Sequence, residues 1–185
     1  GATFFFHVRK IAIFSYCAGF SYFFILQIVA SLLALAVSSS SGSSCPSGFY
    51  RILDSCIKLS RDKQNFDSAQ QKCAQLVPNG RLFEPKNRLQ NELVKTLVKI
   101  QQPSNAWIGI TLNRSKGRFE YSSSGKDASF QDWAPGNPNQ TGDCVIFWFQ
   151  WPNDGGNVDD SRRGKWNDEN CPKKMSYICE QPLTT

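Results

Sequence analysis

Near its C-terminal end the chain carries two adjacent side chains that can hold a metal ion. Asn167 and Asp168 offer an amide oxygen and a carboxylate side by side, directly after Trp166. Ca²⁺ takes oxygen ligands of these two kinds. Cys171 and Cys179 follow, and disulfide bonds at these cysteines would pin the turn to its flanks. The residues therefore predict part of a calcium site, which other segments of the chain must complete.

The cysteines predict a disulfide-bonded extracellular domain. Of the seven cysteines, Cys17 lies in an apolar N-terminal stretch and the others follow residue 44. An even number in a compact segment is typical of a disulfide framework formed in an oxidising compartment. The alternative is a structural zinc site, but the chain has no Cys-x-x-Cys pair and its single histidine, His7, lies outside this segment. We therefore expect disulfide bonds.

Composition also narrows the class of function. Without a histidine after His7, neither a Ser-His-Asp nor a Cys-His arrangement can form in the cysteine-rich part of the chain. The net charge is +6, yet the lysines and arginines are scattered along the sequence. We therefore expect neither an enzyme nor a nucleic-acid-binding protein.

The N-terminal segment has two interpretations. Residues 11–37 contain no charged side chain and follow Arg9 and Lys10. We interpret the segment as a cleaved secretory signal, because small residues suited to cleavage stand at 34–36. The alternative is a membrane anchor, for which about 20 apolar residues suffice. Both place the rest of the chain outside the cytoplasm, as a secreted or a type II membrane protein. The predicted segments are a signal peptide or signal anchor at 1–36, a serine-rich tether at 37–44 and a folded domain at 45–182.

Two helices and several short strands must position the metal-ligand pair. The helices are expected to begin after Asn65 and after Asn87, with Gln90 as a capping-box partner of the second. The positions expected to face the core are Phe66, Ala69, Cys73 and Leu76 in the first helix and Leu89, Leu93, Leu97 and Ile100 in the second. Strand-like runs occur at 48–53, 106–111, 118–121 and 145–151. The pattern predicts an α+β fold with helices packed on an antiparallel sheet.

In this order the motifs resemble a C-type lectin domain of the long form. The matching residues are Trp107-Ile108-Gly109, Trp133 ahead of a proline-containing loop, Asn137-Pro138-Asn139, Asp143-Cys144-Val145, Trp166-Asn167-Asp168, the Cys171 and Cys179 spacing, and Tyr177-Ile178-Cys179-Glu180. The resemblance covers Cys45 to Gln181. It implies two helices on short antiparallel sheets, a long ligand loop and three disulfides, which are Cys45–Cys56, Cys73–Cys179 and Cys144–Cys171.

The resemblance also implies a sugar site. In family members that bind sugars, a Ca²⁺ ion contacts both the protein and two vicinal sugar hydroxyls. The ligand positions that correspond here are Asn137, Asn139, Gly142, Asn167 and Asp168. Gly142 has no side chain, so the neighbouring Asp143 is the candidate replacement. Asn139 weakly favours a mannose-type sugar.

The charge of this ligand set predicts a weak calcium site. It contains one carboxylate, Asp168, or two with Asp143, and calcium affinity rises with the number of carboxylate ligands. Asn139 also begins an N-glycosylation sequon, Asn139-Gln140-Thr141, as does Asn113 in Asn113-Arg114-Ser115. A glycan on Asn139 would occupy the amide that should face the ion.

A long insertion between Cys144 and Trp166 carries further aromatic and acidic residues. Trp148 or Trp151 could present a ring to the apolar face of a sugar, with core packing as the alternative. The acidic residues of the insertion, expected to be a solvated loop, are Asp154, Asp159 and Asp160.

Taken together, the sequence predicts an extracellular lectin that binds glycans or glycoproteins through a loop-bound calcium. The alternative is a calcium-independent protein-binding domain of the same fold. The N-terminal segment adds membrane anchoring as a second way of holding the domain outside the cell.

Overall fold

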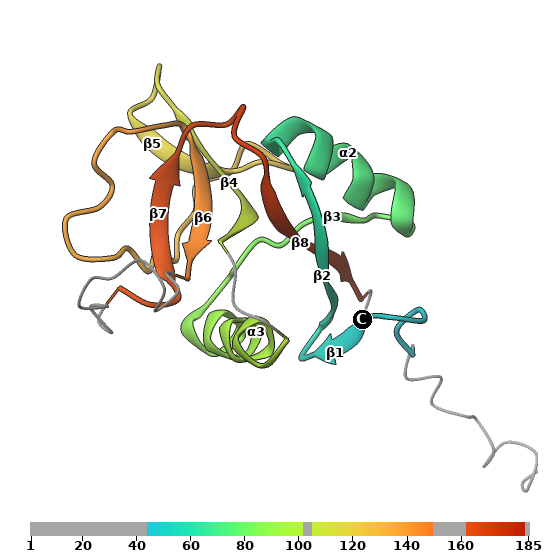
Figure 1. Ribbon diagram of the computed structural model, residues 1–185. Helices are drawn as coiled ribbons and strands as arrows, with labels where there is room; N and C mark the ends of the chain where they lie inside the picture. Colours follow the sequence, from blue (N-terminus) through green and yellow to red (C-terminus); the bar gives the residue numbers. More distant parts are fainter. Residues whose placement is uncertain (1–43, 102–104, 150–161, 184–185) are drawn as a thin grey trace, which may run out of the picture. The chain divides into compact units, whose positions relative to one another are not determined.

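A computed structural model describes residues 44–101, 105–149 and 162–183 (Figure 1). The predicted N-terminal signal or anchor, most of the tether, Trp151 and the acidic residues of the insertion lie outside the described residues. Among the described residues, no helix is long and apolar enough to cross a membrane.

The described part of the chain forms one mixed sheet with two helices. In chain order the elements are β1 (Tyr50–Ile52), β2 (Ser55–Gln64), α2 (Phe66–Leu76), β3 (Arg81–Leu82), α3 (Arg88–Ile100), β4 (Ala106–Asn113), β5 (Arg118–Tyr121), β6 (Cys144–Trp148), β7 (Lys165–Glu169) and β8 (Met175–Pro182). The strand order is β1-β2-β8-β4-β6-β7, with β3 paired to β8 and β5 paired to β4. All pairs are antiparallel except β4 with β8. The predicted α+β fold is confirmed.

Both helices begin at the predicted caps. The Asn65 side chain accepts a hydrogen bond from the Ser68 amide at 2.8 Å, and the Asn87 side chain accepts one from the Gln90 amide at 2.9 Å. These bonds satisfy amides that the first turn of a helix leaves without a partner. The Gln90 side chain accepts from the Lys86 amide instead of completing the expected capping box with Asn87.

The predicted buried face of α3 is wrong. Its buried residues are Gln90, Asn91, Val94 and Val98, whereas Leu89, Leu93 and Ile100 are exposed. The helix buries the polar side chain of Asn91 because hydrogen-bond partners surround it in the core. Asn91 donates to Asp132 at 3.0 Å and accepts from the Trp166 indole at 3.1 Å. In α2 the predicted Phe66, Ala69 and Cys73 are buried, but Leu76 is exposed.

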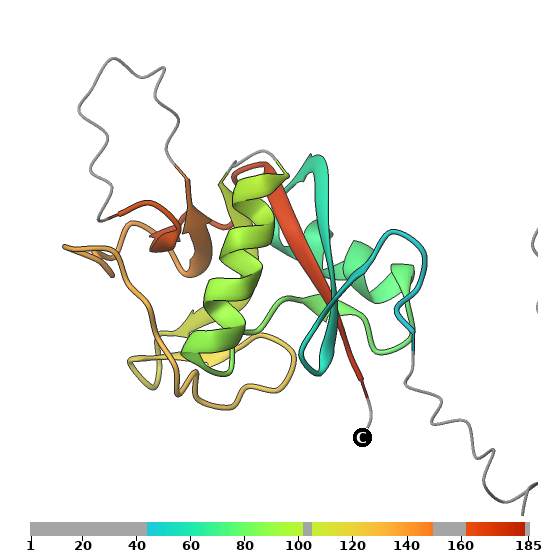
Figure 2. The same ribbon diagram turned by 90° about the horizontal axis from the view of Figure 1, so that it is seen from below.

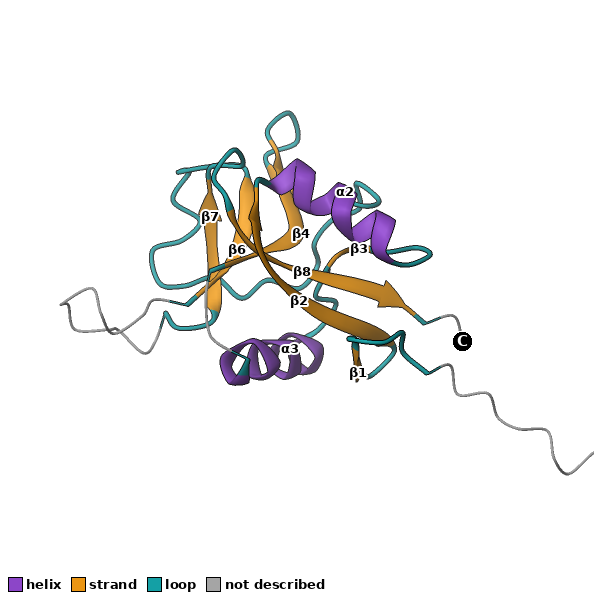
Figure 3. Cartoon of the chain, turned by 45° about the vertical axis from the view of Figure 1, so that its right-hand side comes forward, coloured by secondary structure: helices purple, strands orange, loops and turns teal. Residues whose placement is uncertain are grey.

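The two helices cover different parts of the core (Figures 2 and 3). Val94 and Val98 of α3 pack with a cluster that contains Phe147 and Trp166. α2 packs with a second cluster, centred on Trp107 and Tyr177. Trp107 and Trp166 are fully buried, so both serve the core. The strands β6 and β7, which lie at one end of the strand order, contribute Phe147 and Trp166 to the first cluster.

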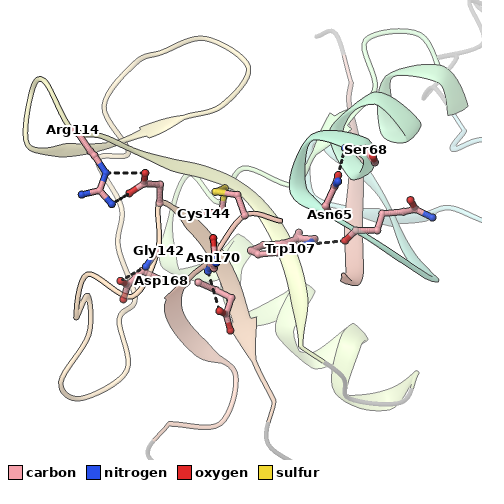
Figure 4. The surroundings of a disulfide bond; sticks show 12 residues. Asn65, Ser68, Trp107, Arg114, Gly142, Cys144, Asp168 and Asn170 are labelled. Carbon is pink, nitrogen blue, oxygen red and sulfur yellow. Dashed lines mark hydrogen bonds and ion pairs between the residues drawn. A yellow bond between two sulfur atoms is a disulfide. The ribbon is translucent and has the colours of Figure 1, made fainter. Parts of the chain in front are cut away.

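The disulfides have the expected connectivity. Cys45 pairs with Cys56, Cys73 with Cys179, and Cys144 with Cys171. The second of these joins α2 to β8 over 106 residues of sequence, which in the chain-entropy account corresponds to about 4–5 kcal/mol. The third joins the start of β6 to the turn after β7, and it lies beside the predicted ligand residues (Figure 4).

Candidate functional site

The candidate site lies along the outer edge of β7. This strand is the last in the sheet order, and it alternates between partly exposed and buried residues, with Trp166 and Asp168 pointing inward. The loop that precedes β6 runs beside this edge. Its Ala134 amide donates to the Trp166 carbonyl at 2.9 Å. The sheet edge is therefore covered by the loop that contains Asn137 and Asn139.

Asp168 of β7 anchors that loop through hydrogen bonds. Its side chain is fully buried, and one carboxylate oxygen accepts the Asn139 amide at 2.8 Å. The other oxygen lies 3.5 Å from the Gly142 amide (Figure 4) and 3.5 Å from the Thr141 hydroxyl. The Asp168 carbonyl accepts the Thr141 hydroxyl at 2.6 Å and the Asn167 side-chain amide at 3.0 Å. The buried charge is thus stabilised by donors from the loop itself.

The two asparagines of the loop have different surroundings. The Asn137 side-chain oxygen is buried and has no hydrogen-bond partner, which is rare for a polar atom in a protein interior. Asn139 is exposed, and its side-chain oxygen accepts the Thr141 amide at 3.1 Å. The peptide bond between Asn137 and Pro138 is cis. The structure therefore brings Asn137, Asn139 and the β7 pair to one edge, as the resemblance implies.

Gly142 is required by packing. A Cβ at this position would lie 2.0 Å from the carbonyl carbon and oxygen of Glu169 and 2.4 Å from the amide nitrogen of Asn170. The loop and the end of β7 therefore touch backbone to backbone at this point. Sequence reasoning treats Gly142 only as a missing ligand and misses this contact.

Asp143 is engaged elsewhere. Its carboxylate forms a two-point ion pair with Arg114, with Nε 2.9 Å from Oδ2 and Nη2 2.7 Å from Oδ1 (Figure 4). The Leu112 amide also donates to the Asp143 carbonyl at 2.7 Å. Asp143 thereby ties the start of β6 to the β4–β5 hairpin. In the sequence Arg114 stands out only as the middle residue of a sequon, and no local pattern reveals its partner.

The oxygen atoms at this edge of the sheet, as they are arranged, do not fit a tight calcium site. Ca²⁺ takes about six to eight oxygen ligands. The Asp168 oxygens accept loop donors, and the Asp143 carboxylate is held by Arg114. Two buried side-chain oxygens of the set, Asn137 Oδ1 and Asp143 Oδ1, accept no hydrogen bond, but Asp143 Oδ1 lies 2.7 Å from Arg114 Nη2. Within the described ranges, no group of three or more histidine, cysteine or acidic side chains lies close enough to share a metal ion.

Trp148 does not join this cluster. It pairs with Lys165, whereas Asp168 pairs with Val145, so three steps along β6 separate the two positions. At about 3.3 Å a step, this amounts to ~10 Å. The Arg162 guanidinium lies 5.6 Å from the centre of the Trp148 ring. The backbone of Trp148 is therefore offset from that of the ligand residues along β6, and a contact between its ring and a sugar stays a prediction.

The two sequons differ in their surroundings. The Asn113 side chain is bound within the hairpin, where it donates to Glu120 at 2.9 Å and accepts from the Ser115 hydroxyl at 2.7 Å. Asn139 stands on the exposed loop. Glycosylation at either position stays a prediction.

A hollow of about 310 Å³ adjoins the edge. It lies between the β4–β5 hairpin and the loop, and its lining includes Leu112, Arg114, Phe119, Pro138, Gln140 and Asp168. Sequence reasoning assigned no role to the hairpin side of this hollow, because these residues are distant from the loop along the chain.

Comparison with known proteins finds a matching domain profile, similar sequences and similar solved structures. The sequence profile of the lectin C-type domain matches residues 62–181. The C-type lectin lectoxin-Phi1 of Philodryas olfersii is 30% identical over 160 residues, which is 80% of this chain and 93% of that protein. Among solved structures, SPL-1 in a GlcNAc complex has a TM-score of 0.63 at 20% identity, over 75% of this chain and 96% of that chain. The Ca²⁺-independent C-type lectin SPL-2 from Saxidomus purpuratus has a TM-score of 0.62 at 18% identity, over 74% of this chain and 93% of that chain.

Proposed function

Because the chain belongs to the C-type lectin domain family, we propose that it is an extracellular module that binds carbohydrate at the edge of β7. The three disulfides support an oxidising compartment. The fold is shared with SPL-1, whose solved structure is a complex with GlcNAc. A binding role suits a chain whose only histidine is His7.

One observation carries the proposal, namely the anchoring of the loop on Asp168. The Asn139 amide and the Thr141 hydroxyl are bound to this buried residue, so the exposed Pro138, Asn139 and Gln140 are held in one conformation. Amide side chains both donate and accept hydrogen bonds, as sugar hydroxyls do. A preformed loop with exposed amides therefore suits a polyhydroxylated ligand.

Direct hydrogen bonding is the mechanism that the arrangement favours. The acidic side chains at the edge are already engaged, and the shared fold is compatible with the absence of an ion, since SPL-2 is described as Ca²⁺-independent. Coordination of sugar by calcium, with a mannose-type preference, is the second candidate. The orphaned Asn137 oxygen favours it, because a buried acceptor without a donor suits a cation. Such a site would be weak, with a Kd of about 1 mM or higher.

Glycan binding by the secreted full chain tests the proposal. A panel of neutral and acidic glycans is screened with calcium and, separately, with a chelator. We expect binding in both buffers, weakened by Asn139→Ala and Asn167→Ala. Gln75→Ala on α2 is the control, because it removes an exposed amide far from β7 along the sheet. An absence of glycan binding in both buffers would refute the proposal. Binding only with calcium would select the second mechanism.

A further inference from the structure

The hollow beside the loop has the size of a small ligand site. Its volume of about 310 Å³ falls at the lower end of the ~300–1,000 Å³ typical of ligand pockets. The hairpin supplies Leu112 and Phe119, and the loop supplies Pro138 and Gln140. A Cβ built on Gly117, another lining residue, would meet no atom within 4 Å, so the hairpin side is open to an incoming molecule. The space suits one sugar ring.

An ion pair and hydrogen bonds within the chain hold the two walls of the hollow. The Arg114–Asp143 ion pair joins the hairpin to the start of β6, and Asp168 holds the loop. Within the hairpin, Glu120 lies 2.8 Å from Lys116, whose ammonium lowers the pKa of Glu120 to about 2. This ion pair therefore persists at all physiological pH values. The two walls keep their separation before a ligand arrives, which lowers the entropic cost of binding.

The charges in the lining favour a neutral ligand. The guanidinium of Arg114 is matched by Asp143 at two points, so it offers little net attraction to an anion. Asp168 also borders the hollow, but its carboxylate is buried and accepts the Asn139 amide. The apolar surface comes from Leu112, Phe119 and Pro138, and the Phe119 ring is backed by Trp133 at a centroid distance of 4.6 Å. A sugar ring has the matching character, with an apolar face and hydroxyls around its rim.

We propose that this hollow is a metal-independent subsite for one neutral sugar residue, a hexose or N-acetylhexosamine. The ring's apolar face lies against Pro138 and the hairpin. Gln140, exposed on the loop, hydrogen-bonds its hydroxyls. The inference rests on the proposed carbohydrate function and names where and how that sugar binds.

Substitutions at Gln140 test the subsite. Gln140 has a φ of 67°, in the left-handed region. Gln140→Gly removes the amide and tolerates this backbone, whereas Gln140→Asn keeps an amide and also tolerates it. Mannose and N-acetylglucosamine are titrated into the full chain by calorimetry in a chelating buffer. N-acetylneuraminic acid serves as the anionic comparison. We expect Gln140→Gly to weaken binding about fivefold or more, Gln140→Asn to retain most of it, and Gln75→Ala to leave it unchanged.

A second measurement locates the sugar. In NMR spectra of the full chain, the neutral sugar should shift the Leu112 methyl signals without shifting those of Leu76 on α2. Chelator-resistant binding with these shifts supports the subsite. If glycans bind only with calcium and Gln140→Gly has no effect, the subsite is refuted while the proposed function stands. Preference for the acidic sugar would also overturn the subsite. If no glycan binds in either buffer, the proposed function itself fails.

Discussion

Gly142 allows a sharp test of how the loop and β7 fit together. In Gly142→Ala, the added Cβ would lie 2.0 Å from the carbonyl carbon and oxygen of Glu169. Nonbonded carbon contacts are favourable near 3.5 Å or more, so the two backbones would have to separate by about 1.5 Å. The Cys144–Cys171 disulfide and the bonds to Asp168 resist that separation. Overpacking costs about 1–3 kcal/mol, and we expect the upper end, ~3 kcal/mol.

Thermal and urea unfolding with the disulfides intact measure this cost. A loss of ~3 kcal/mol corresponds to a fall in Tm of about 10 °C for a domain of this size. Gly117→Ala is the matched control, because its Cβ meets no atom within 4 Å and only its φ of +62° opposes the change. That control should cost about 1–2 kcal/mol. If Gly142→Ala changes the free energy of unfolding by less than about 0.5 kcal/mol, the backbone contact described here is wrong. By the same contact, Gly142→Glu should destabilise the loop instead of creating a calcium ligand.

Two further predictions concern buried carboxylates. Asp168→Ala leaves the Asn139 amide without an acceptor and should lower the free energy of unfolding in urea by ~1–3 kcal/mol. Asp168→Asn keeps an acceptor oxygen and should lower it by less. Equal losses in the two variants would show that the hydrogen bond is not the cause. Burial raises the pKa of Glu180 from 4.5 to about 7, against the opposing ion pair with Arg81. Since the folded state then favours the protonated form, the free energy of unfolding should fall as pH rises from 4.5 through 7, by at most ~3 kcal/mol. Glu180→Gln should flatten this dependence, and an unchanged slope would contradict the assignment.

The parts of the fold that depend on residues close together in the chain could be predicted from the sequence. The caps at Asn65 and Asn87 bind amides three residues away, so a short stretch of sequence contains the whole interaction. β4 and β5 also occur where the strand-like runs at 106–111 and 118–121 predict them. The long strand β2 was missed because its second half is highly charged; pairing with β8 explains why it is nevertheless a strand.

The face of α3 could not be predicted because its partners are remote. Asn91 is buried against Trp166, 75 residues away, and against Asp132, 41 residues away. Apolar spacing alone favoured Leu89 and Leu93, which face solvent. The prediction is wrong because it assumes that every polar side chain of the helix faces solvent. A polar side chain can be buried when it has hydrogen-bond partners.

The candidate site was predicted in part. The resemblance implied that Asn139 and Asp168 lie together, and the structure joins them by a hydrogen bond of 2.8 Å. It could not reveal that Asp143 is held by Arg114, because the two are 29 residues apart and meet only through the hairpin. The need for glycine at 142 likewise depends on the nearby backbone of Glu169, and a pattern of side chains in the sequence does not reveal that contact.

The Cys45–Cys56 disulfide determines how mechanical force enters the domain. Cys56 lies in β2 and is in register with Gln181 of β8, so a pull on the chain ahead of Cys45 passes through the sulfurs into these two strands. β1 lies outside that path, since the covalent bond bypasses it. Force applied between the chain ahead of Cys45 and the edge of β7 would therefore pass through the long β2–β8 pair, and the short strand β1 would not be peeled away.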